Sequence, residues 1–393
     1  MNRPSELSAR PILEIDGFPD YRLTGPGTLG GRYMRLFWQP IYVAAELERG
    51  RAAPIRIMSE DFTLYRGESG APQVLAQRCA HRGTQLSTGW VEGDCVRCFY
   101  HGWKYDASGQ CVEMPAEDES FPAKVRIRSY PTVEYLGLIF AYLGEGHAPP
   151  LPRFRTLEEE GVLTADSYIR GCNVFNNLES NMDELHVAFV HRNSEFTNVG
   201  LNRDLPTISG NETEYGIVKH GTRSDGVVRV SHFFWPNVLY IKGSPDPNDA
   251  TGWTDHVGWR VPIDDFSHVS FVVQLVHVSG DAADQVRQRL DEKRRKKPAS
   301  NEPTAAELAE AVLRGELHTD DLAHRPDIVN IQDYVAQAGQ GRIAVRDNEH
   351  LGRSDVVLIL FRKVYERELR AFAEGRPLKQ WAIPKRLAAT SGV

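Results

Sequence analysis

The feature that most constrains this chain is a pair of cysteine–histidine motifs within residues 79–103. The first reads Cys79-Ala-His81 and the second reads Cys98-Phe-Tyr-His101. Both lie in glycine-containing segments, which can turn tightly enough to direct backbone N–H groups towards sulfur. Two thiolates and two imidazoles are a ligand set for a zinc ion or an iron–sulfur cluster, so the sequence predicts a metal centre here.

The cysteine content favours metal binding over a disulfide framework. The chain has five cysteines, an odd number, and four of them fall between residues 79 and 111. In a long chain from a reducing compartment, clustered cysteines are more often metal ligands than disulfide partners. Cys95 and Cys111 fall outside the two motifs, and we interpret both as structural.

The spacing of the motifs separates zinc from an iron–sulfur cluster. C-x-H followed by C-x-x-H is not a common zinc-finger spacing, whereas in a Rieske [2Fe–2S] cluster two cysteines hold one iron and two histidines hold the other. The segment resembles the Rieske domain of soluble oxygenases, including Arg82-Gly83 after the first pair and Gly102-Trp103 after the second. The resemblance implies that the cluster ligands are Cys79, His81, Cys98 and His101.

A second group of candidate ligands lies in residues 173–191, which contain Asn177, Asn181, Asp183, His186 and His191. Two histidines and one carboxylate on one face of a metal are typical of non-haem iron oxygenases. On a regular α-helix, side chains five residues apart point roughly 140° apart. If both histidines bind one ion, the helix is therefore expected to bend, bulge or end between them.

The pattern Asp-x-x-His-x4-His, with asparagines upstream, resembles the mononuclear iron motif of Rieske oxygenases. The resemblance implies that His186 and His191 bind Fe(II). It also implies that Asp183 accepts hydrogen bonds from His186 and from a Rieske histidine of a neighbouring subunit, His81 or His101. Such a carboxylate orients both imidazoles and couples the two centres.

The third iron ligand is expected far along the chain. Residues 330–341, Asn-Ile-Gln-Asp-Tyr-Val-Ala-Gln-Ala-Gly-Gln-Gly, resemble the corresponding region of the phthalate- and vanillate-type subgroup, and Asp333 matches the ligand position. His350 lies in a segment that also resembles that subgroup. Because two histidines and Asp333 complete the ligand set, we interpret His350 as structural.

The length of 393 residues predicts two domains, since it exceeds what one hydrophobic core commonly organises. We expect an N-terminal arm at residues 1–36, a Rieske domain at residues 37–150 and a catalytic domain at residues 151–393. The proline-rich segment 148–152 disfavours helix and central strand, which places the boundary there. Short β-type runs broken by turn signals between residues 37 and 145 predict a small β-sandwich.

The second part of the chain mixes expected strands and helices. Residues 228–241 and 267–278 are predicted strands, and residues 281–297 have a helical composition. Thr304 and Glu307 form a capping-box pattern, and a last long helix is expected to start with Ser354 as its N-cap and stop near Gly375. The expected fold class is α+β, with helices over an antiparallel sheet; the resemblance implies a helix-grip, START-like catalytic domain.

Charge and hydropathy exclude some classes of function. The net charge is −7, whereas nucleic-acid-binding proteins are usually basic, so no nucleic-acid partner is expected. No run approaches the roughly 18 apolar residues that a membrane span needs, and the first residues contain no apolar segment typical of a signal peptide. We therefore expect a cytoplasmic protein without a membrane partner.

The resemblance implies the terminal oxygenase component of a multicomponent system. Electrons from NAD(P)H would arrive through a separate flavin and iron–sulfur reductase or a ferredoxin, because no Gly-rich dinucleotide fingerprint follows a strand here. The cluster would pass them to Fe(II), with O₂ as co-substrate, to hydroxylate or oxidatively demethylate an aromatic compound. The subgroup implies a homotrimer. Asn237 and His256 are candidate substrate contacts in a mostly apolar pocket.

Three alternatives remain at this point. The same iron chemistry can produce cis-dihydroxylation of an aromatic ring. An electron carrier with an inactive ligand-binding domain would also retain the Rieske motif, although the intact set of His186, His191 and Asp333 argues against it. A zinc-stabilised binding module would be colourless, whereas a Rieske protein is red-brown.

Overall fold

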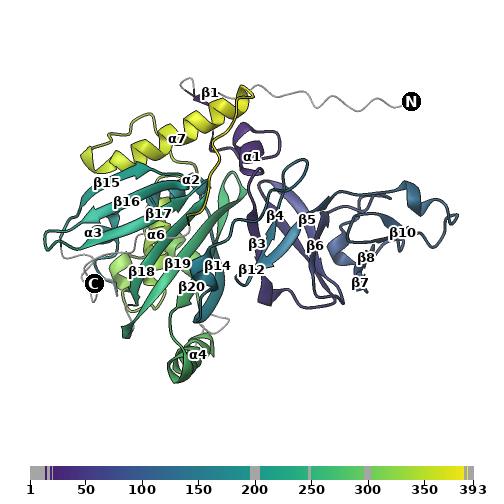
Figure 1. The fold of residues 1–393 in the computed structure, drawn as a ribbon, viewed down its shortest axis with the longest axis horizontal. Helices are drawn as coiled ribbons and strands as arrows, with labels where there is room; N and C mark the ends of the chain where they lie inside the picture. Colours follow the sequence, from purple (N-terminus) through teal and green to yellow (C-terminus); the bar gives the residue numbers. More distant parts are fainter. Residues whose placement is uncertain are drawn as a thin grey trace.

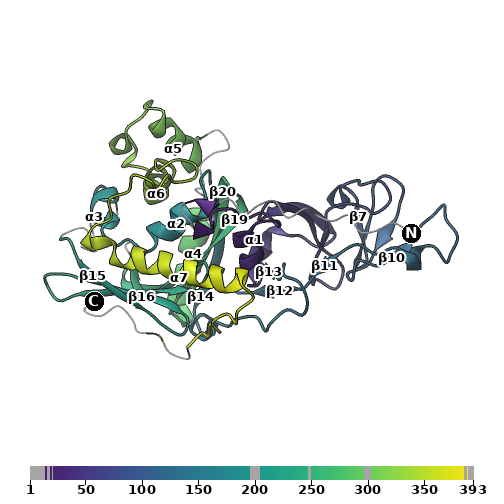
Figure 2. The ribbon, with the colours of Figure 1, turned by 90° about the horizontal axis from the view of Figure 1, so that it is seen from above.

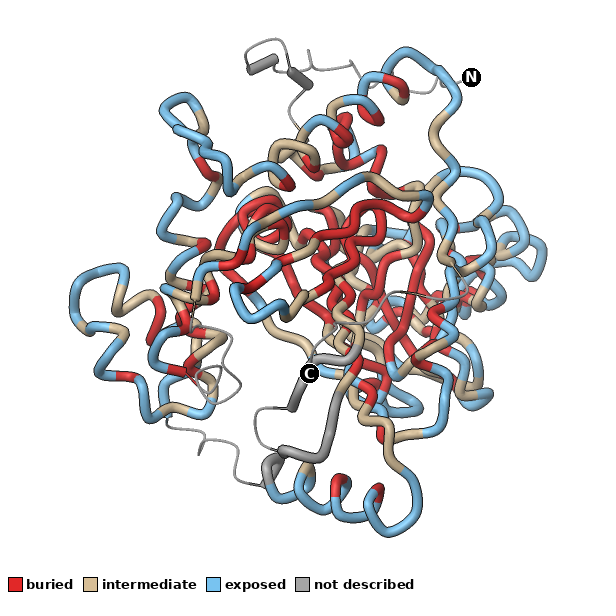
Figure 3. The backbone as a smooth tube through the Cα atoms, turned by 60° about the vertical axis from the view of Figure 1, so that its left-hand side comes forward, coloured by how far each residue is buried: buried red, intermediate tan, exposed pale blue. Residues whose placement is uncertain are grey.

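The structure of the chain, a computed structural model, describes residues 14–15, 18–19, 21–194, 204–246, 249–295, 302–384 and 387. It is elongated, with a β-rich N-terminal lobe at one end and a larger lobe of sheet and helices at the other (Figure 1). Buried backbone runs continuously through the interior of the larger lobe (Figure 3). A short hairpin of β1 (Glu14–Ile15) and β2 (Phe18–Pro19) precedes the first lobe.

The N-terminal lobe contains three small antiparallel sheets. Two of them, in the orders β11-β6-β5-β4 and β12-β13-β3, form the body of the lobe, and the third, in the order β10-β9-β8-β7, forms its outer tip. Alternating residues of the central strands point inward, as Phe62 and Leu64 do. The strands are β3 (Gln39–Val43), β4 (Arg51–Ile57), β5 (Glu60–Arg66), β6 (Pro72–Ala76), β7 (Trp90–Glu92), β8 (Cys95–Arg97), β9 (Lys104–Tyr105), β10 (Cys111–Glu113), β11 (Ser129–Tyr130), β12 (Thr132–Tyr135) and β13 (Leu138–Ala141).

The larger lobe is built on one seven-stranded antiparallel sheet in the order β14-β20-β19-β18-β17-β16-β15. Its strands are β14 (Val162–Arg170), β15 (Thr207–Glu212), β16 (Gly216–Thr222), β17 (Val228–Phe234), β18 (Val238–Asp246), β19 (Asp249–Asp264) and β20 (Ser267–Val276). The expectation of one strand over residues 228–241 is wrong. A turn at the cis Trp235–Pro236 bond divides this segment into β17 and β18, which pair with each other.

Helices cover one face of this sheet, with α7 lying across it, whereas α4 projects beyond one end of the sheet (Figures 1 and 2). The described helices are α1 (Leu29–Met34), α2 (Val174–Ser180), α3 (His186–Val190), α4 (Gly280–Arg295), α5 (Ala305–Leu313), α6 (Ile328–Ala338) and α7 (Val356–Ala373). The capping box of Thr304 and Glu307 is confirmed at α5. The expected N-cap of the last helix is wrong by one residue, because a 3-10 turn at Arg353–Asp355 makes Asp355 the N-cap.

The two faces of the large sheet contact different neighbours. On one face Trp259 packs against Phe140 of the N-terminal lobe, with ring centroids 5.5 Å apart. On the other face Phe233 packs against Phe361 of α7, at 5.3 Å. Successive side chains of a strand point to opposite faces of the sheet. The polar side chains that point to the second face approach α2 and α6.

The predicted fold class is confirmed: the chain is α+β, with a lobe of small antiparallel sheets followed by helices over a large antiparallel sheet. Within the described ranges, no helix combines the length and the apolar character needed to cross a bilayer.

Candidate metal centres

The first candidate centre lies at the outer tip of the N-terminal lobe, in the loops before β7 and after β8. Cys79 and Cys98 are both 2% exposed, whereas His81 and His101 are exposed. The two imidazole rings lie together, with centroids 4.4 Å apart. The structure therefore brings together the four residues that the sequence predicts, with thiols on the inside and imidazoles on the outside.

The two loops have the same backbone geometry. Cys79 N donates to Thr84 O at 2.8 Å and Gly83 N donates to Cys79 O at 2.9 Å. In the second loop Cys98 N donates to Trp103 O at 2.8 Å and Gly102 N donates to Cys98 O at 3.1 Å. Gly83 and Gly102 adopt φ values of 75° and 74°, a left-handed conformation that glycine adopts without steric cost. Two matching loops suit a group that is bound symmetrically from both sides.

Aromatic side chains support these loops. The Tyr105 hydroxyl lies 3.3 Å from Cys79 Sγ and accepts a hydrogen bond from the backbone N–H of Ala80 at 3.1 Å. Trp103 stacks on the His81 ring, with centroids 4.6 Å apart and planes 10° apart. A hydrogen bond donated by the Tyr105 hydroxyl to sulfur would stabilise negative charge on a bound cluster. Buried thiols paired with accessible imidazoles thus fit the donor set of a Rieske cluster.

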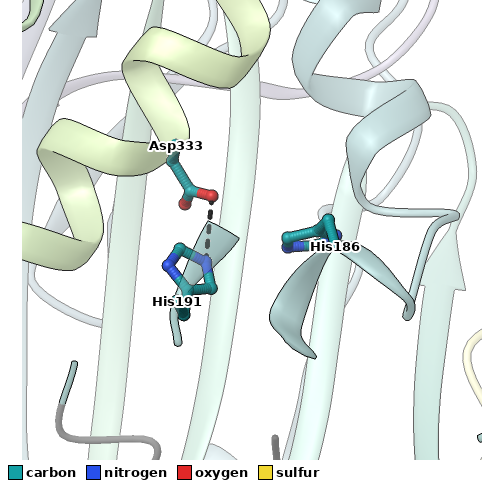
Figure 4. A group of neighbouring side chains, drawn as sticks. All are labelled: His186, His191 and Asp333. Atoms are coloured by element: carbon teal, nitrogen blue, oxygen red, sulfur yellow. Dashed lines mark ion pairs between the residues drawn. The ribbon is translucent and has the colours of Figure 1, made fainter. Parts of the chain in front are cut away.

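The second candidate centre lies between α3 and α6. One ligand atom from each of His186, His191 and Asp333 falls within 4.8 Å of the others. His191 Nε2 lies 3.2 Å from Asp333 Oδ1, and His186 faces the same space from the start of α3 (Figure 4). Two imidazoles and one carboxylate converging from one side match the donor set of non-haem iron.

The predicted interruption between the two histidines is confirmed. Helix α3 spans only His186–Val190, and His191 follows as its C-cap with φ −100° and ψ 20°. Because the helix ends there, His191 leaves the helical direction and turns towards α6. Among the described residues, His186 Nδ1 is buried without a partner at hydrogen-bond distance and lies 3.7 Å from Asp183 Oδ2, so Nε2 is the ring nitrogen left for a metal.

The electrostatics of the site favour an ionised carboxylate. Burial disfavours the charged form of Asp333, yet the hydrogen bond with His191 and the charge of Arg170 hold the pKa of this carboxyl well below its usual range. Arg170 Nη2 lies 3.5 Å from Asp333 Oδ2 and donates to Asn330 Oδ1 at 3.0 Å. Asp333 is therefore held as an anion, ready to bind a cation.

Sequence reasoning missed the residue that orients His191. Gln332 Oε1 lies 3.0 Å from His191 Nδ1, and an amide oxygen can only accept, so Nδ1 donates to it, and Nε2, 3.2 Å from Asp333 Oδ1, is the ring nitrogen left for a metal. No local signal marked it, because the contact joins residues 141 positions apart in the chain.

Asp183 lies at the edge of this centre. Its Oδ2 is 3.7 Å from His186 Nδ1, its Oδ1 accepts from Leu185 N at 2.7 Å, and its side chain is 40% exposed. The carboxylate thus faces His186 on one side and the surface on the other. This is the arrangement that the bridging hypothesis requires.

The two candidate substrate contacts differ in their surroundings. Asn237 is 1% exposed, and its amide donates to Gln39 Oε1 at 2.7 Å and Arg260 O at 2.8 Å, contacts that tie β18 to its neighbours. His256 is partly exposed on β19, and its Nδ1 lies 3.3 Å from Gln274 Nε2. Burial and the charges of Arg260 and Arg229 lower the pKa of His256 to about 4. His350 is exposed.

Comparison with known proteins identifies the family. Residues 37–131 match the Rieske [2Fe-2S] domain. The chain is 31% identical to the 5,5'-dehydrodivanillate O-demethylase oxygenase subunit of Sphingobium sp., over 90% of this chain and 80% of that protein. This chain belongs to the Rieske non-haem iron oxygenases. It is also 30% identical to the phenoxybenzoate dioxygenase subunit alpha of Ectopseudomonas oleovorans, over 92% of this chain and 87% of that protein.

Solved structures agree with this assignment at the level of fold. NdmA of Pseudomonas putida CBB5 with caffeine superposes with a TM-score of 0.67 at 19% identity, covering 92% of this chain and 100% of that chain. As an oxygenase alpha component of the phthalate- and vanillate-type subgroup, this Rieske oxygenase uses a [2Fe–2S] cluster, a mononuclear iron and O₂. Its electrons come from NAD(P)H through an electron-transfer partner.

Proposed function

We propose that this Rieske oxygenase hydroxylates or oxidatively demethylates an aromatic compound, with His186, His191 and Asp333 as the iron ligands. The observation that carries the proposal is the convergence of their three donor atoms within 4.8 Å. The O-demethylase relative, 31% identical, supports oxidative demethylation. An electron carrier with an inactive ligand-binding domain is disfavoured, because it would have no need for a complete iron triad.

We also propose the cluster ligands and the division of the chain. Cys79, His81, Cys98 and His101 hold the [2Fe–2S] cluster at the tip of the N-terminal lobe. Residues 37–150 form the Rieske domain and residues 151–393 the catalytic domain, with residues 1–36 as an N-terminal arm. The end of this arm is an integral part of the fold, since Leu29 and Tyr33 of α1 are buried.

Each group of residues has a defined task. When bound, the cluster supplies single electrons and the mononuclear iron activates O₂. His186, His191 and Asp333 occupy one side of the metal position and leave the opposite side to substrate and O₂. Gln332 accepts from His191 Nδ1 and so leaves Nε2 to face the metal position, and Arg170 favours the ionised form of Asp333. Asp183 links His186 to the surface, where an electron donor can reach it.

We propose that the donor is the Rieske tip of a second subunit in a homotrimer. Within one chain the tip and α3 lie at opposite ends of the molecule (Figures 1 and 2). The tip presents exposed His81 and His101 together with Trp90, Phe99 and Tyr100, which are 52%, 60% and 54% exposed. An exposed aromatic patch around electron-transfer ligands suits a protein contact. A flavin and iron–sulfur reductase or a ferredoxin supplies electrons to the trimer.

The ligand assignment is tested by metal analysis of anaerobically purified protein. About three irons and two acid-labile sulfides per chain are expected, with a Rieske EPR signal after reduction. His186→Ala should retain two irons, two sulfides and the Rieske signal, because only the mononuclear iron is lost. Loss of the cluster from this variant, or retention of the third iron, would show that the ligand assignment is wrong.

The bridging role is tested with Asp183→Asn, a change that keeps the size of the side chain and removes its charge. Both metal centres should be retained, while turnover with the reductase should fall by roughly two orders of magnitude or more. The measurement is stopped-flow oxidation of the reduced cluster in the presence of O₂ and substrate. Electron transfer at the wild-type rate would refute the bridge.

A further inference from the structure

An arginine directly precedes each of the two cluster cysteines, and the two arginines make the same contact. Arg78 Nη1 donates to the carbonyl oxygen of Gly83 at 2.9 Å, and Arg97 Nη1 donates to the carbonyl oxygen of Gly102 at 2.8 Å. The two glycines are those with positive φ that close the loops. Each guanidinium therefore spans its own loop, from the residue before the cysteine to the glycine.

The spacing of these contacts is the same in two loops that otherwise differ. In the first loop one residue separates the cysteine from the histidine, and in the second loop two residues do. The arginine and the glycine nevertheless lie five positions apart in both loops. The position of the histidine shifts, whereas the arginine, the cysteine and the glycine keep their relation. The arginine is therefore part of the frame that the two loops share.

Arg97 is held on all sides. Its side chain is 16% exposed. Its Nε and Nη2 donate to the carboxylate of Glu92, each at 2.9 Å, and its Nη1 and Nη2 donate to that of Glu113, at 3.0 and 2.8 Å. Together with Gly102, these acceptors satisfy every N–H of the guanidinium. Because Glu92, Arg97 and Glu113 end β7, β8 and β10, the second loop is tied to three strands of the tip.

The charges around Arg97 balance. Lys104 pairs with Glu92 at 3.2 Å, so two cations and two carboxylates lie together. Hydrogen bonds from Arg97 lower the pKa of both Glu92 and Glu113, which keeps both carboxylates ionised at neutral pH. Arg97 therefore adds no net charge beside the second loop, and its contribution is one of position.

Arg78 has different surroundings. It is exposed, and in the part of the chain that the structure describes no carboxylate pairs with it. Its contact with Gly83 is accompanied by a positive charge that nothing nearby cancels. The two arginines thus allow the effect of position and the effect of charge to be separated.

We propose that Arg97 and Arg78 are positioning residues for the [2Fe–2S] cluster, each of which holds its Cys/His loop through the carbonyl oxygen of the loop glycine. Backbone N–H groups directed at sulfur favour the reduced cluster, because that form carries one more negative charge. A loop released at its glycine no longer keeps its N–H groups in one direction. The inference rests on the proposed cluster ligands and adds two residues outside the ligand set that raise the reduction potential.

The role of Arg97 is tested with a charge-balanced double variant, Arg97→Met with Glu113→Gln, which removes the contact with Gly102 and keeps the net charge. Redox titration of the full chain, followed by EPR, should show the equilibrium shifted roughly 3- to 10-fold towards the oxidised cluster, or about 30 to 60 mV for one electron. An unchanged or higher potential would overturn the role of Arg97.

The matched control is Glu113→Gln alone, which keeps the contact between Arg97 and Gly102. Its potential should not fall, because the substitution removes a negative charge. A fall equal to that of the double variant would also contradict the proposal. Iron and sulfide are measured first in each protein. A wild type without a Rieske signal would refute the cluster assignment itself, whereas an unchanged potential at full cluster content refutes only the role of the arginine.

Arg78→Met extends the test to an exposed position, where the substitution does not disturb packing. It removes the contact and the charge, so the potential should fall by a similar factor. The part due to charge should shrink between about 0.1 M and about 1 M salt, because the Debye length falls from about 10 Å to about 3 Å. A fall that disappears completely at high salt would show that Arg78 acts only by charge and would overturn its positioning role.

The control for Arg78 is Arg126→Met. Arg126 is also exposed in the N-terminal lobe and donates to a turn carbonyl, Ser108 O at 3.3 Å, outside the two loops. At about 1 M salt its potential should equal that of the wild type, while that of Arg78→Met stays lower. Equal potentials for the two variants at this salt concentration would contradict the proposal.

Discussion

At the scale of single residues, the catalytic lobe depends on side chains that are fixed in one protonation state. His268 is fully buried on the face of the large sheet that approaches α2. Its Nδ1 lies 2.8 Å from the carbonyl oxygen of Cys172, which can only accept, so Nδ1 carries the hydrogen and Nε2 accepts from Asn177 Nδ2 at 2.9 Å. Both nitrogens are thus satisfied in the neutral ring.

This burial makes His268 a source of acid sensitivity. Burial, reinforced by the charges of Arg170 and Arg260, lowers its pKa to about 3, against the hydrogen bond to Cys172. The unfolded chain binds a proton on this residue below pH 6.5 and the folded chain does not. The free energy of unfolding should therefore fall as the pH drops from 6.5, by up to about 1.4 kcal/mol per pH unit from this residue.

The measurement is urea unfolding of wild type and His268→Gln at pH 7 and pH 5. The variant is expected to be less stable at pH 7, because it loses the fitted imidazole, and the difference between the two proteins should shrink at pH 5. A difference that stays constant with pH would show that His268 does not remain neutral in the folded protein.

At the scale of elements, helix α6 sets the position of the third iron ligand. Asn176 of α2 donates to the carbonyl oxygens of Gln337 and Gly341, each at 2.9 Å. Tyr334 of α6 donates to Glu310 of α5 at 2.9 Å and accepts from Gly171 N at 3.1 Å. Contacts on both sides therefore fix the helix, and with it Asp333, relative to α3.

The same helix places Gln332 against His191, which leads to a prediction about iron affinity. Gln332→Leu fills similar space but removes the acceptor that selects the tautomer of His191. Iron should dissociate roughly 10- to 100-fold more readily, while the Rieske spectrum stays unchanged. Competition with a chelator gives the affinity.

A matched control is Gln340→Leu, at an exposed position just beyond the end of α6. It should bind iron as the wild type does. Unaltered iron affinity in Gln332→Leu would mean that His191 is oriented by something other than this amide.

At the scale of the whole molecule, the separation of the two centres makes activity a property of the assembly. Figure 1 shows the Rieske tip and α3 at the two ends of one chain. If electrons cross between subunits, a chain that lacks only iron can still donate, and a chain that lacks only the cluster can still accept. Mixed oligomers should therefore recover activity that neither variant has alone.

The two variants are His186→Ala and Cys98→Ser, co-expressed with different affinity tags. In a head-to-tail ring of three, every doubly tagged oligomer has about a third of its interfaces combining an intact donor with an intact acceptor, so it should show about a third of the wild-type rate of substrate-dependent O₂ consumption. Mixed oligomers with no activity, although both subunits are folded by circular dichroism, would place the electron transfer within one subunit.

Local sequence determined the features that depend on residues close together in the chain. Each of the two Cys/His loops is short and contains a glycine with positive φ. The residues that set the ligand spacing and the loop backbone therefore lie within a few positions of each other in the sequence. The five-residue spacing of His186 and His191, together with the resemblance that assigns both to one ion, predicted the end of α3, because a regular helix cannot direct both rings to one point. The cap of α5 likewise depends only on Thr304 and Glu307.

Tertiary structure decided the features that depend on pairing across long separations. Composition could not select Asp333 from 53 acidic residues; only the resemblance selected it, and the packing of α6 then brings it to the histidines. Arg170 and Arg260 have no visible relation in the sequence. They lie on one face of the sheet because β20 lies between β14 and β19 in a fixed register. Register and strand order are set by the burial of whole faces, so no local pattern contains them.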